Sequence, residues 1–220
     1  MFKIAIDGPS GAGKSSVAKA LSKKIGIVYV DTGALYRTVG YYIRSVGADP
    51  KSADQVTPHL KDINIELKYE NGTQYVYLNG ENLGDKIREP EISMYASAVS
   101  AIPAVRAFLL ETQKAVARAN NVVMDGRDIG TVIIPDADVK VFLTASNETR
   151  AKRRTLELLS KGVDVCYEDV LADMIQRDKK DKNRDIAPAI PAADAVIFDN
   201  SVMTVEESLK EIVRLVNERK

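Results

Sequence analysis

The octapeptide GPSGAGKS at positions 8–15 limits the possible folds of this chain more than any other feature. It matches the pattern G-x-x-x-x-G-K-[ST] and stands between an apolar run, Phe2–Asp7, and a helical pattern, Lys14–Ile25. Glycines let such a loop wrap so that backbone N–H groups point at phosphates, and the following helix adds its positive dipole end. Lys14 would reach the β- and γ-phosphates of a nucleoside triphosphate, and the Ser15 hydroxyl would lie against Mg²⁺. The sequence therefore predicts a phosphate-binding loop between a strand and a helix.

Short apolar runs rich in β-branched residues recur along the chain, each followed by a polar residue or glycine. Continuous apolar character favours strands that are buried on both faces of a parallel sheet. Amphipathic helical patterns lie between the runs, and this alternation is typical of an α/β fold. We therefore predict a five-stranded parallel sheet with helices on both faces. The runs are Phe2–Asp7, Ile27–Asp31, Val122–Asp125, Val139–Thr144 and Ala195–Asp199, and the clearest helical patterns are Lys14–Ile25, Ala104–Ala119 and Glu206–Val216.

One segment, from about Ile63 to Leu83, breaks this pattern. In INIELKY and TQYVYLNG polar and apolar residues alternate, and the dipeptides Asn71-Gly72 and Asn79-Gly80 are typical of hairpin turns. We predict a small antiparallel sheet inserted in the α/β core. Ligands of parallel sheets bind at the carboxyl ends of the strands. Here those ends carry Gly8, Asp31–Thr32, Asp125–Asp128 and Thr144.

The amino-acid composition limits which partners and which cellular compartment we expect for this chain. Lys plus Arg and Asp plus Glu number 31 each, so no overall positive field draws the chain to nucleic acid or to an anionic membrane. No stretch approaches the roughly 18 apolar residues of a membrane span, and the N-terminal apolar run is too short for a signal peptide. The single cysteine, Cys166, excludes an internal disulfide and fits a reducing compartment. We expect a cytoplasmic monomer with small-molecule substrates and with neither nucleic acid nor membrane as a partner.

Arginines are grouped after the predicted strands and in a charged segment, 160–184. Phosphoryl transfer needs positioning and neutralisation of spreading negative charge, and a guanidinium can grip a phosphate with two hydrogen bonds. Taken alone, any one of these arginines is more often part of a surface ion pair. Three of them, at 150, 153 and 154, share one helix face, and we interpret them as an arginine-rich lid that excludes water. The group is Arg37, Arg106, Arg127, Arg150, Arg153, Arg154, Arg177 and Arg184.

A phosphate-binding loop alone does not separate a kinase from a nucleotide-dependent switch. The guanine-reading pattern N-K-x-D of GTPase switches is absent, and the nearest string, KNRD at 182–185, does not match it. The residues favour a phosphotransferase. Two alternatives stay open: a P-loop kinase for another small acceptor, and a switch that binds a protein partner.

Longer strings resemble the bacterial-type cytidylate kinase family, a branch of the nucleoside monophosphate kinases. IAIDGPSGAGKSSVAKALSKKIG and VYVDTGALYRTVGYYI are similar to the opening of that family. VVMDGRDIGTVIIPDADVKVFLTAS and RDKKDKNRDIAPAIPAADAVIFDNS are similar to its third-to-fifth strand region. The resemblance covers essentially the whole chain, including the insertion. It implies transfer of the γ-phosphate of ATP to CMP or dCMP, with Mg²⁺, in pyrimidine nucleotide metabolism.

The resemblance also frames the organisation that we expect for the chain. One P-loop kinase domain would occupy 1–220, with its core at about 1–50, 100–148 and 186–220. A monophosphate-binding region with the β insertion would occupy about 51–99. A helical lid with the basic segment would occupy about 149–185.

Carried over position by position, the resemblance implies three sets of site residues. Catalytic roles fall on Lys14, Arg127, Asp128, Arg177 and Arg184. The triphosphate site falls on Gly8, Pro9, Ser10, Gly11, Ala12, Gly13, Lys14, Ser15 and Ser16, with Arg153 added from the lid and Ser15 as the metal ligand. The CMP site falls on Asp31, Thr32, Tyr36, Arg37, Ser97, Arg106, Arg127, Asp128, Arg177, Asp181 and Arg184.

Two departures from the family pattern bear on these assignments. Thr32 stands where some members carry Ser, and both residues provide a hydroxyl. Lysines at 179, 180 and 182 fill a run where relatives often have more arginines. Because Lys cannot grip a phosphate with two hydrogen bonds, this leaves open which side chains of 177–184 contact phosphate.

Overall fold

Five parallel strands form the sheet that the apolar runs predict, in the order β2-β6-β1-β7-β8. The structure is a computed structural model that describes residues 1–70 and 73–219. The α/β prediction is confirmed, and β6 is buried along its whole length, which explains its continuous apolar character. The strands are β1 (Lys3–Asp7), β2 (Val28–Asp31), β6 (Val122–Gly126), β7 (Val139–Thr144) and β8 (Val196–Asp199).

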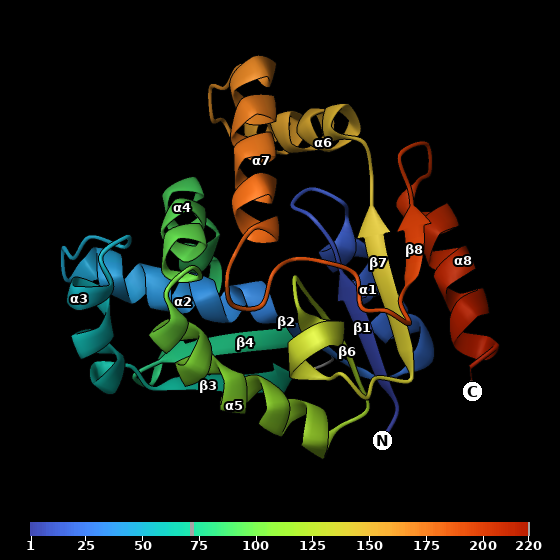
Figure 1. Ribbon diagram of the computed structural model, residues 1–220, viewed down its shortest axis with the longest axis horizontal. Coiled ribbons are helices and arrows are strands. Elements are labelled where there is room, and N and C mark those ends of the chain that lie inside the picture. The colour runs from blue at the N-terminus through green and yellow to red at the C-terminus, as the bar shows by residue number, and fades with distance from the viewer. Residues whose placement is uncertain (71–72, 220) are drawn as a thin grey trace. The chain divides into compact units, whose positions relative to one another are not determined.

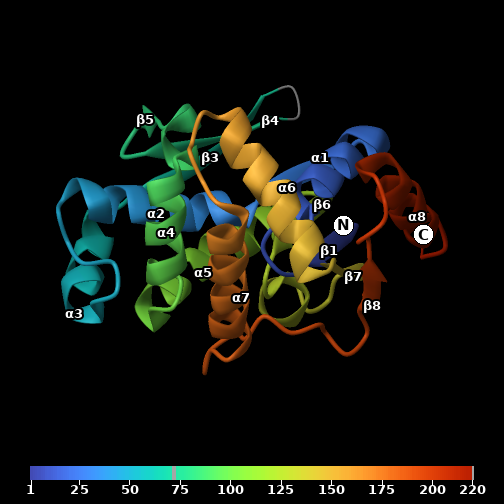
Figure 2. The ribbon, with the colours of Figure 1, turned by 90° about the horizontal axis from the view of Figure 1, so that it is seen from above.

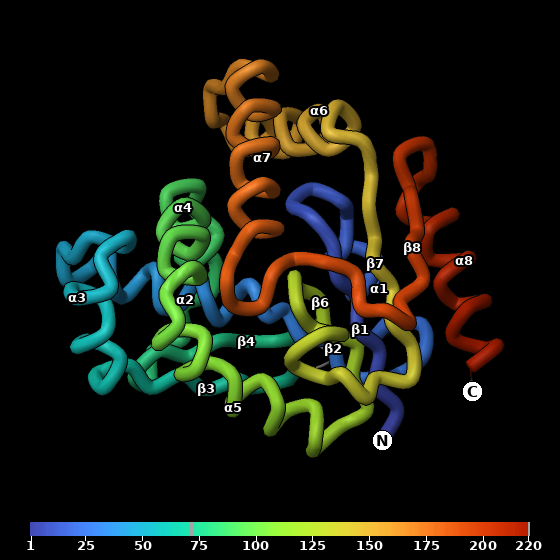
Figure 3. Tube along the Cα trace, viewed as in Figure 1, coloured from blue at the N-terminus to red at the C-terminus, as the bar shows by residue number. Residues whose placement is uncertain are grey.

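The chain divides into two compact units, and the first of them comprises residues 2–26 and 123–220. In it β7 pairs in parallel with β1 on one side and with β8 on the other (Figure 1). Helix α1 (Lys14–Ile25) packs beside α8 (Val205–Asn217) (Figure 2). The chain leaves α6 (Asn147–Ser160) and turns into α7 (Tyr167–Lys182) (Figure 3), and these two helices share a small apolar cluster.

A wide helical turn of the π type, η3 (Ile129–Ile133), follows β6 in the same unit. The N–H groups of Val132 and Ile133 both donate to the backbone oxygen of Asp128. Such turns are rare, and they occur often at functional sites. This one comes directly after Arg127 and Asp128, which are predicted site residues.

The other compact unit comprises Met1 and residues 27–122, and it holds the predicted insertion. Strands β3 (Ile65–Glu70), β4 (Thr73–Leu78) and β5 (Glu81–Asn82) form a three-stranded sheet in that order, with antiparallel pairing. Asn79 (φ 50°) and Gly80 (φ 85°) turn β4 into β5 with the left-handed backbone that an Asn-Gly turn requires. The insertion and this turn are confirmed. The predicted turn at Asn71-Gly72 lies outside the described residues.

Helices surround this sheet in its own unit and form the apolar core with it. They are α2 (Thr32–Ser45), α3 (Ala53–Val56), η1 (Thr57–Asp62), η2 (Gly84–Arg88), α4 (Pro90–Val99) and α5 (Pro103–Ala119). Helices α2 and α4 pack closely at Gly40, where a Cβ atom would lie 2.8 Å from the backbone nitrogen of Ala96. Only glycine fits there without a shift. This packing holds α2, whose first turn carries predicted acceptor-site residues.

Among the described residues, no single helix is long and apolar enough to cross a membrane. Helices α4 and α5 reach that length and composition only as a pair, and the pair is bent by 101°. The division of the chain into a core, a monophosphate-binding region and a lid follows other boundaries than the two compact units, and it stays a prediction.

Candidate active site

The phosphate loop runs from the end of β1 to the start of α1, as its sequence predicts. Gly8, Gly11 and Gly13 have φ values of 146°, 72° and 87°, a region that side chains rarely adopt. A Cβ atom on Gly8 would lie 1.9 Å from the backbone oxygen of Leu143, so β7 also requires glycine there. Helix α1 begins at Lys14, and its unpaired first N–H groups follow the loop directly. The loop therefore has the geometry of an anion-binding site.

Polar groups from elsewhere in the same unit fasten the loop from outside. The backbone oxygen of Ser10 accepts from a guanidinium nitrogen of Arg150 at 2.8 Å, and the backbone nitrogen of Ser10 donates to Asp178 at 3.4 Å. The side-chain amide of Asn200 donates to the backbone oxygen of Ala12 at 3.0 Å. Two of these contacts occupy backbone oxygens of the loop, and the third occupies the backbone nitrogen of Ser10. They stabilise one loop conformation before any ligand binds.

Lys14 is buried, and its ammonium group donates to the backbone oxygen of Pro9 at 2.7 Å. Burial and, to a lesser extent, the nearby Arg127 guanidinium lower the pKa of Lys14 to about 7, while Asp125 and Asp7 oppose the shift. A phosphate anion would supply the negative charge that this cation lacks. The position and electrostatics of Lys14 thus suit a ligand with several negative charges.

The Ser15 hydroxyl donates to the Asp125 carboxylate at 2.8 Å. Asp125 is buried near the end of β6. Sequence reasoning did not include it among the site residues, although it noted the carboxyl end of this strand. A hydroxyl oxygen and a carboxylate beside a phosphate loop fit the way Mg²⁺ is held in P-loop proteins, through few protein ligands and the phosphates themselves. No cluster of three or more His, Cys, Asp or Glu side chains in the described chain could hold a metal ion by itself.

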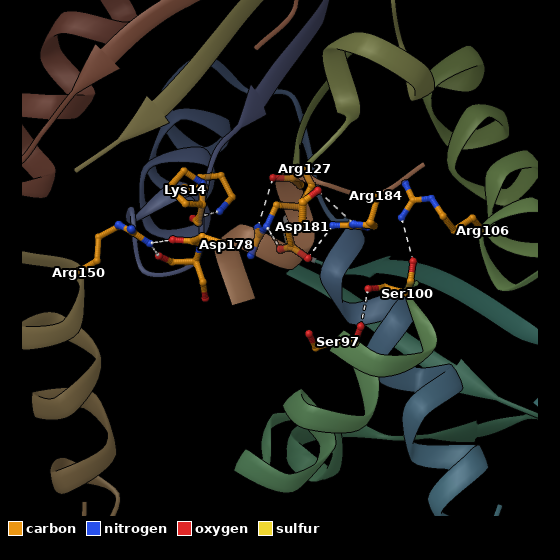
Figure 4. Close-up of polar contacts among 12 residues, drawn as sticks. Lys14, Ser97, Ser100, Arg106, Arg127, Arg150, Asp178, Asp181 and Arg184 are labelled. Carbon is orange, nitrogen blue, oxygen red and sulfur yellow. Dashed lines mark hydrogen bonds and ion pairs between the residues drawn. The ribbon is translucent and has the colours of Figure 1, made fainter. Parts of the chain in front are cut away.

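Three predicted site residues come together around one carboxylate (Figure 4). Asp181 accepts from Nε of Arg127 at 3.0 Å and forms an ion pair with Arg184 at 2.8 Å. Burial disfavours the charged form of Asp181, but Arg127 and Arg184 outweigh it and hold the pKa of this carboxyl below its usual value. The carboxylate therefore stays ionised, and it orients two guanidinium groups, one directly after β6 and the other shortly after α7.

Arg177 lies one turn before Asp181 on α7, and its Nε is buried without a hydrogen-bond partner within 1–70 and 73–219. Burial lowers its pKa to about 10, with a further contribution from Arg127. Positive charge is therefore concentrated around Lys14, Arg127 and Arg177, since Arg127 lowers the pKa of both other groups and Arg177 lowers that of Lys14. Asp128, also buried, is the N-cap residue of η3 and comes directly after Arg127.

The three arginines of the predicted lid face have different partners. Arg150 is buried and pairs with Asp178 at 2.5 Å as well as with Ser10. Arg153 donates to the side chain and backbone of Asn200 and to the backbone of Met203. Arg154 pairs with Glu157 on its own helix at 2.8 Å. Arg150 and Arg153 therefore support the phosphate loop from outside, directly and through Asn200. Their predicted roles in gripping phosphate stay predictions.

In the unit of residues 27–122, Asp31 is the centre of the predicted acceptor residues. It ends β2, and one of its carboxylate oxygens caps α2 by accepting from the backbone nitrogen of Ala34 at 3.0 Å. The other oxygen accepts from Arg37 at 2.7 Å. Arg88, 3.9 Å away, adds a second positive charge. Thr32, the first residue of α2, is buried beside them.

Gln74 of β4 is a residue near Asp31 that sequence reasoning missed. Its amide pairs with both backbone groups of Asp31, accepting from N at 2.9 Å and donating to O at 3.3 Å. This contact joins the insertion to the end of β2. No local sequence signal marks it, because the two residues are 43 positions apart.

The remaining predicted acceptor residues lie on α2, α4 and α5. The Arg106 guanidinium lies 5.7 Å from the centre of the Tyr36 ring, which is a cation–π distance. Arg106 also donates to the backbone oxygen of Ser100 at 3.3 Å, and the Ser100 hydroxyl donates to the backbone oxygen of Ser97 at 2.9 Å (Figure 4). These contacts hold an arginine, an aromatic ring and serines in one local network.

These features define a P-loop nucleotide-binding protein of the kinase type. A glycine-rich phosphate loop follows the first strand of a parallel sheet, and a buried lysine, a Ser–Asp pair and several arginines accompany it. The chain belongs to the cytidylate kinase family, whose model matches residues 4–218. The chain is 50% identical over 217 residues to the cytidylate kinase of Fervidobacterium nodosum, covering 99% of this chain and 97% of the relative. It is 47% identical over 217 residues to that of Thermosipho africanus (99% and 95%) and 45% identical over 214 residues to that of Caldicellulosiruptor saccharolyticus (97% and 95%).

Solved structures of low sequence identity share the fold. A shikimate kinase from Bacteroides thetaiotaomicron superposes with a TM-score of 0.51 at 16% identity over 98% of both chains. An uncharacterized protein from Eubacterium ventriosum gives a TM-score of 0.52 at 17% identity over the full length of both chains. At such identities the likeness shows the fold alone.

Proposed function

We propose that this protein transfers the γ-phosphate of ATP to CMP or dCMP, producing CDP or dCDP and ADP. Membership of the cytidylate kinase family supports the activity and the acceptor. The observation that carries the proposal is the cluster of positive charge around Lys14, with Arg127 oriented by Asp181 and with Arg177 buried nearby. Such a cluster suits a reaction in which negative charge spreads over a phosphoryl group in transit.

The donor half of the reaction uses the phosphate loop. Backbone N–H groups of residues 11–16, in the loop and at the start of α1, would bind the triphosphate, with Lys14 at its β- and γ-phosphates. Ser15 and Asp125 would hold Mg²⁺ together with the phosphates, and the ion would neutralise charge on the β- and γ-oxygens. Residues such as Arg150 and Asn200 keep the loop in its binding conformation through backbone oxygens.

The acceptor half of the site needs side chains that bind the phosphate of the acceptor and side chains that form hydrogen bonds with a pyrimidine nucleoside. Arg37 and Arg106 supply guanidinium groups, and Asp31 and Ser97 supply oxygens suited to sugar hydroxyls or to the base edge. Asp128, Arg127, Arg177, Asp181 and Arg184 complete the set that we assign to the acceptor and to the transferred group. These assignments rest on the family motif together with the contacts described above.

The chemistry needs no dedicated general base. An oxygen of the acceptor phosphate, already ionised near neutral pH, attacks the γ-phosphorus while the bond to the β–γ bridging oxygen breaks and ADP departs. The side chains position the two phosphates in line and neutralise the charge that develops. Arg127 contributes most directly, since Asp181 keeps its guanidinium in a fixed orientation close to Lys14.

Other properties of the protein are extensions of this proposal. A small nucleotide as the acceptor, a cytoplasmic location and a monomeric state are consistent with the balanced charge of 31 basic and 31 acidic residues. The alternatives from the sequence are a kinase for another small acceptor and a nucleotide-dependent switch. The switch would hydrolyse ATP slowly and without stimulation by an acceptor.

A coupled assay of ADP release tests the proposal with CMP, dCMP, UMP, AMP and shikimate as acceptors. We expect rapid ADP release with CMP or dCMP, loss of activity on chelation of Mg²⁺, and its return when Mg²⁺ is added. Arg127→Ala should lower kcat by about a hundredfold or more and raise the CMP requirement, because it removes charge next to the transferred group. Lys14→Ala should abolish transfer and leave the fold intact. Near-normal activity of Lys14→Ala would refute the phosphate-loop assignment, and CMP-independent hydrolysis alone would favour the switch.

A further inference from the structure

Asp7, the last residue of β1, is a buried carboxylate that none of the roles above uses. Only 4% of its surface is exposed, directly before the first glycine of the phosphate loop. Each of its oxygens accepts one backbone N–H from the turn η3: Oδ1 from Ile129 at 2.8 Å, and Oδ2 from Gly130 at 2.7 Å. The first N–H groups of a helical turn have no partner within the turn, and here a carboxylate more than 120 positions away in the chain binds two of them.

The turn that Asp7 holds begins directly after Arg127 and Asp128. Asp128 is the residue at the start of η3, and its backbone oxygen closes the turn by accepting from Val132 and Ile133. The orientation of the turn therefore fixes the backbone from which Arg127 projects. We propose that Asp7 is a positioning residue for phosphoryl transfer: its ionised carboxylate ties the turn that places Arg127 and Asp128 to the strand that carries the phosphate loop.

The charge of the carboxylate matters for this role, because only the ionised form accepts both N–H groups with no competing hydrogen. An amide or a protonated carboxyl group carries a hydrogen of its own. That hydrogen would face one of the two backbone N–H groups, and one hydrogen bond would be lost. Burial and, to a lesser extent, Asp128 raise the pKa of Asp7 to about 6, while the two backbone hydrogen bonds and Lys14 oppose the shift. The nearby Lys140 of β7 approaches Gly130 only with its methylene carbons, since its ammonium group is paired with Asp194 at 2.8 Å.

Asp7→Asn is the decisive substitution, because it keeps the shape and removes the charge. We expect kcat to fall about ten- to hundredfold, with the KM values for ATP and CMP within about threefold of the wild type, since a misplaced catalytic group weakens transition-state contacts more than ground-state binding. Asp138→Asn is the matched control. Asp138 accepts from the backbone nitrogen of Lys3 at 2.7 Å near the opposite end of β1 and lies away from the loop. Its kcat should stay within about twofold of the wild type.

The pH dependence separates positioning by a charge from a general structural effect. The ratio of wild-type kcat to Asp7→Asn kcat cancels the ionisation of both substrates. We expect this ratio to fall several-fold as the pH is lowered from 7.5 to 5.5, because protonation of Asp7 makes the wild type resemble the variant. If the variant does not fold, the amide protons of Ile129 and Gly130 in the wild type keep the inference testable, since both resonances should titrate together near pH 6.

The inference rests on the proposed function, and the experiment distinguishes the two. If the wild type does not phosphorylate CMP, the proposed function fails. If Arg127→Ala is strongly impaired while Asp7→Asn keeps kcat within about twofold, the proposed function stands and the positioning role of Asp7 is wrong. The role is equally wrong if Asp138→Asn loses as much kcat as Asp7→Asn, or if neither amide proton titrates between pH 5 and 7.5.

Discussion

At the scale of single residues, Lys14 is held in an environment that disfavours its own charge. Burial and Arg127 lower its pKa to about 7, so at pH 8 only a minor fraction of the unliganded protein carries a charged Lys14. Bound phosphate anions would raise the pKa of Lys14 again, because negative charge within a few ångströms stabilises the ammonium form. Nucleotide binding at the loop should therefore draw a proton from solution.

We predict that ADP binding at pH 8 takes up about nine-tenths of a proton per protein chain, since Lys14 changes from mostly neutral to fully charged. Titration calorimetry in two buffers of different ionisation enthalpy measures this number directly. Lys14→Met is the control and should bind ADP more weakly, with little or no proton uptake. A binding enthalpy that is the same in both buffers for the wild type would contradict the prediction.

The site residues that could be predicted belong to motifs of neighbouring positions. Those that were missed depend on partners far away in the sequence. The phosphate loop is a pattern of consecutive positions whose glycines have a steric reason, so it was recognisable without a structure. Three missed residues bind partners far away in the chain: Asp125 binds Ser15 at 110 positions, Gln74 binds Asp31 at 43, and Asn200 binds Ala12 at 188. Only the folded chain brings such pairs together, and no spacing rule connects them. Arg177 and Arg184 were grouped with the other arginines from the sequence, but their site roles came from the family resemblance, since a charged run alone usually indicates a solvated helix face.

At the scale of elements, the buried Arg150 connects helices α6 and α7 to each other and to the phosphate loop. Arg150 of α6 reaches Asp178 of α7 and the backbone oxygen of Ser10, and its side chain is 3% exposed. The sequence predicted that Arg150, Arg153 and Arg154 share a helix face, but helical spacing cannot tell a buried arginine from an exposed one. Trimming Arg150 should therefore affect folding as well as turnover.

We predict that Arg150→Ala lowers the free energy of unfolding by about 2–4 kcal/mol, because the half-buried Asp178 loses its ion-pair partner and the Ser10 oxygen loses its donor where the arginine itself is buried. Arg154→Ala should change it by less than about 0.5 kcal/mol, since the Arg154–Glu157 pair is a surface pair within one helix. Urea unfolding of the two variants beside the wild type provides the measurement. Equal stability of both variants would mean that the Arg150–Asp178 pair does not fasten the helices.

The strands and the longer helices were predicted well because the pattern of apolar residues within each segment indicates its secondary structure. The five runs became β1, β2, β6, β7 and β8, and the pattern at Lys14–Ile25 matched α1 at both ends. The turn η3 had no such signal. The first N–H groups of this turn (Ile129–Ile133) bind the carboxylate of Asp7, which belongs to another strand and lies more than 120 positions away in the chain.

At the scale of the whole molecule, two buried groups make stability depend on pH in opposite directions. Burial raises the pKa of Asp7 from its ordinary 3.8 to about 6, so between these values the folded protein holds more protons than the unfolded chain. Stability then falls as the pH rises through this window, by about 3 kcal/mol in total. Burial lowers the pKa of Lys14 from 10.5 to about 7, so above pH 7 the unfolded chain holds more protons and stability rises with pH.

We therefore predict that the free energy of unfolding of the unliganded protein passes through a minimum between pH 6 and 7. Urea unfolding at intervals from pH 4.5 to 9 measures the curve, with probes in the unit of residues 2–26 and 123–220, where both groups lie. Asp7→Asn should remove the fall between pH 4.5 and 6 and keep the rise above pH 7, because it deletes only the first of the two groups. Asp181, whose pKa is lowered, contributes its pH dependence below the ordinary carboxyl range and leaves this window unchanged. Parallel curves for the wild type and Asp7→Asn from pH 4.5 to 6 would show that Asp7 is ionised throughout, and that the two backbone N–H groups stabilise its charge more than burial disfavours it.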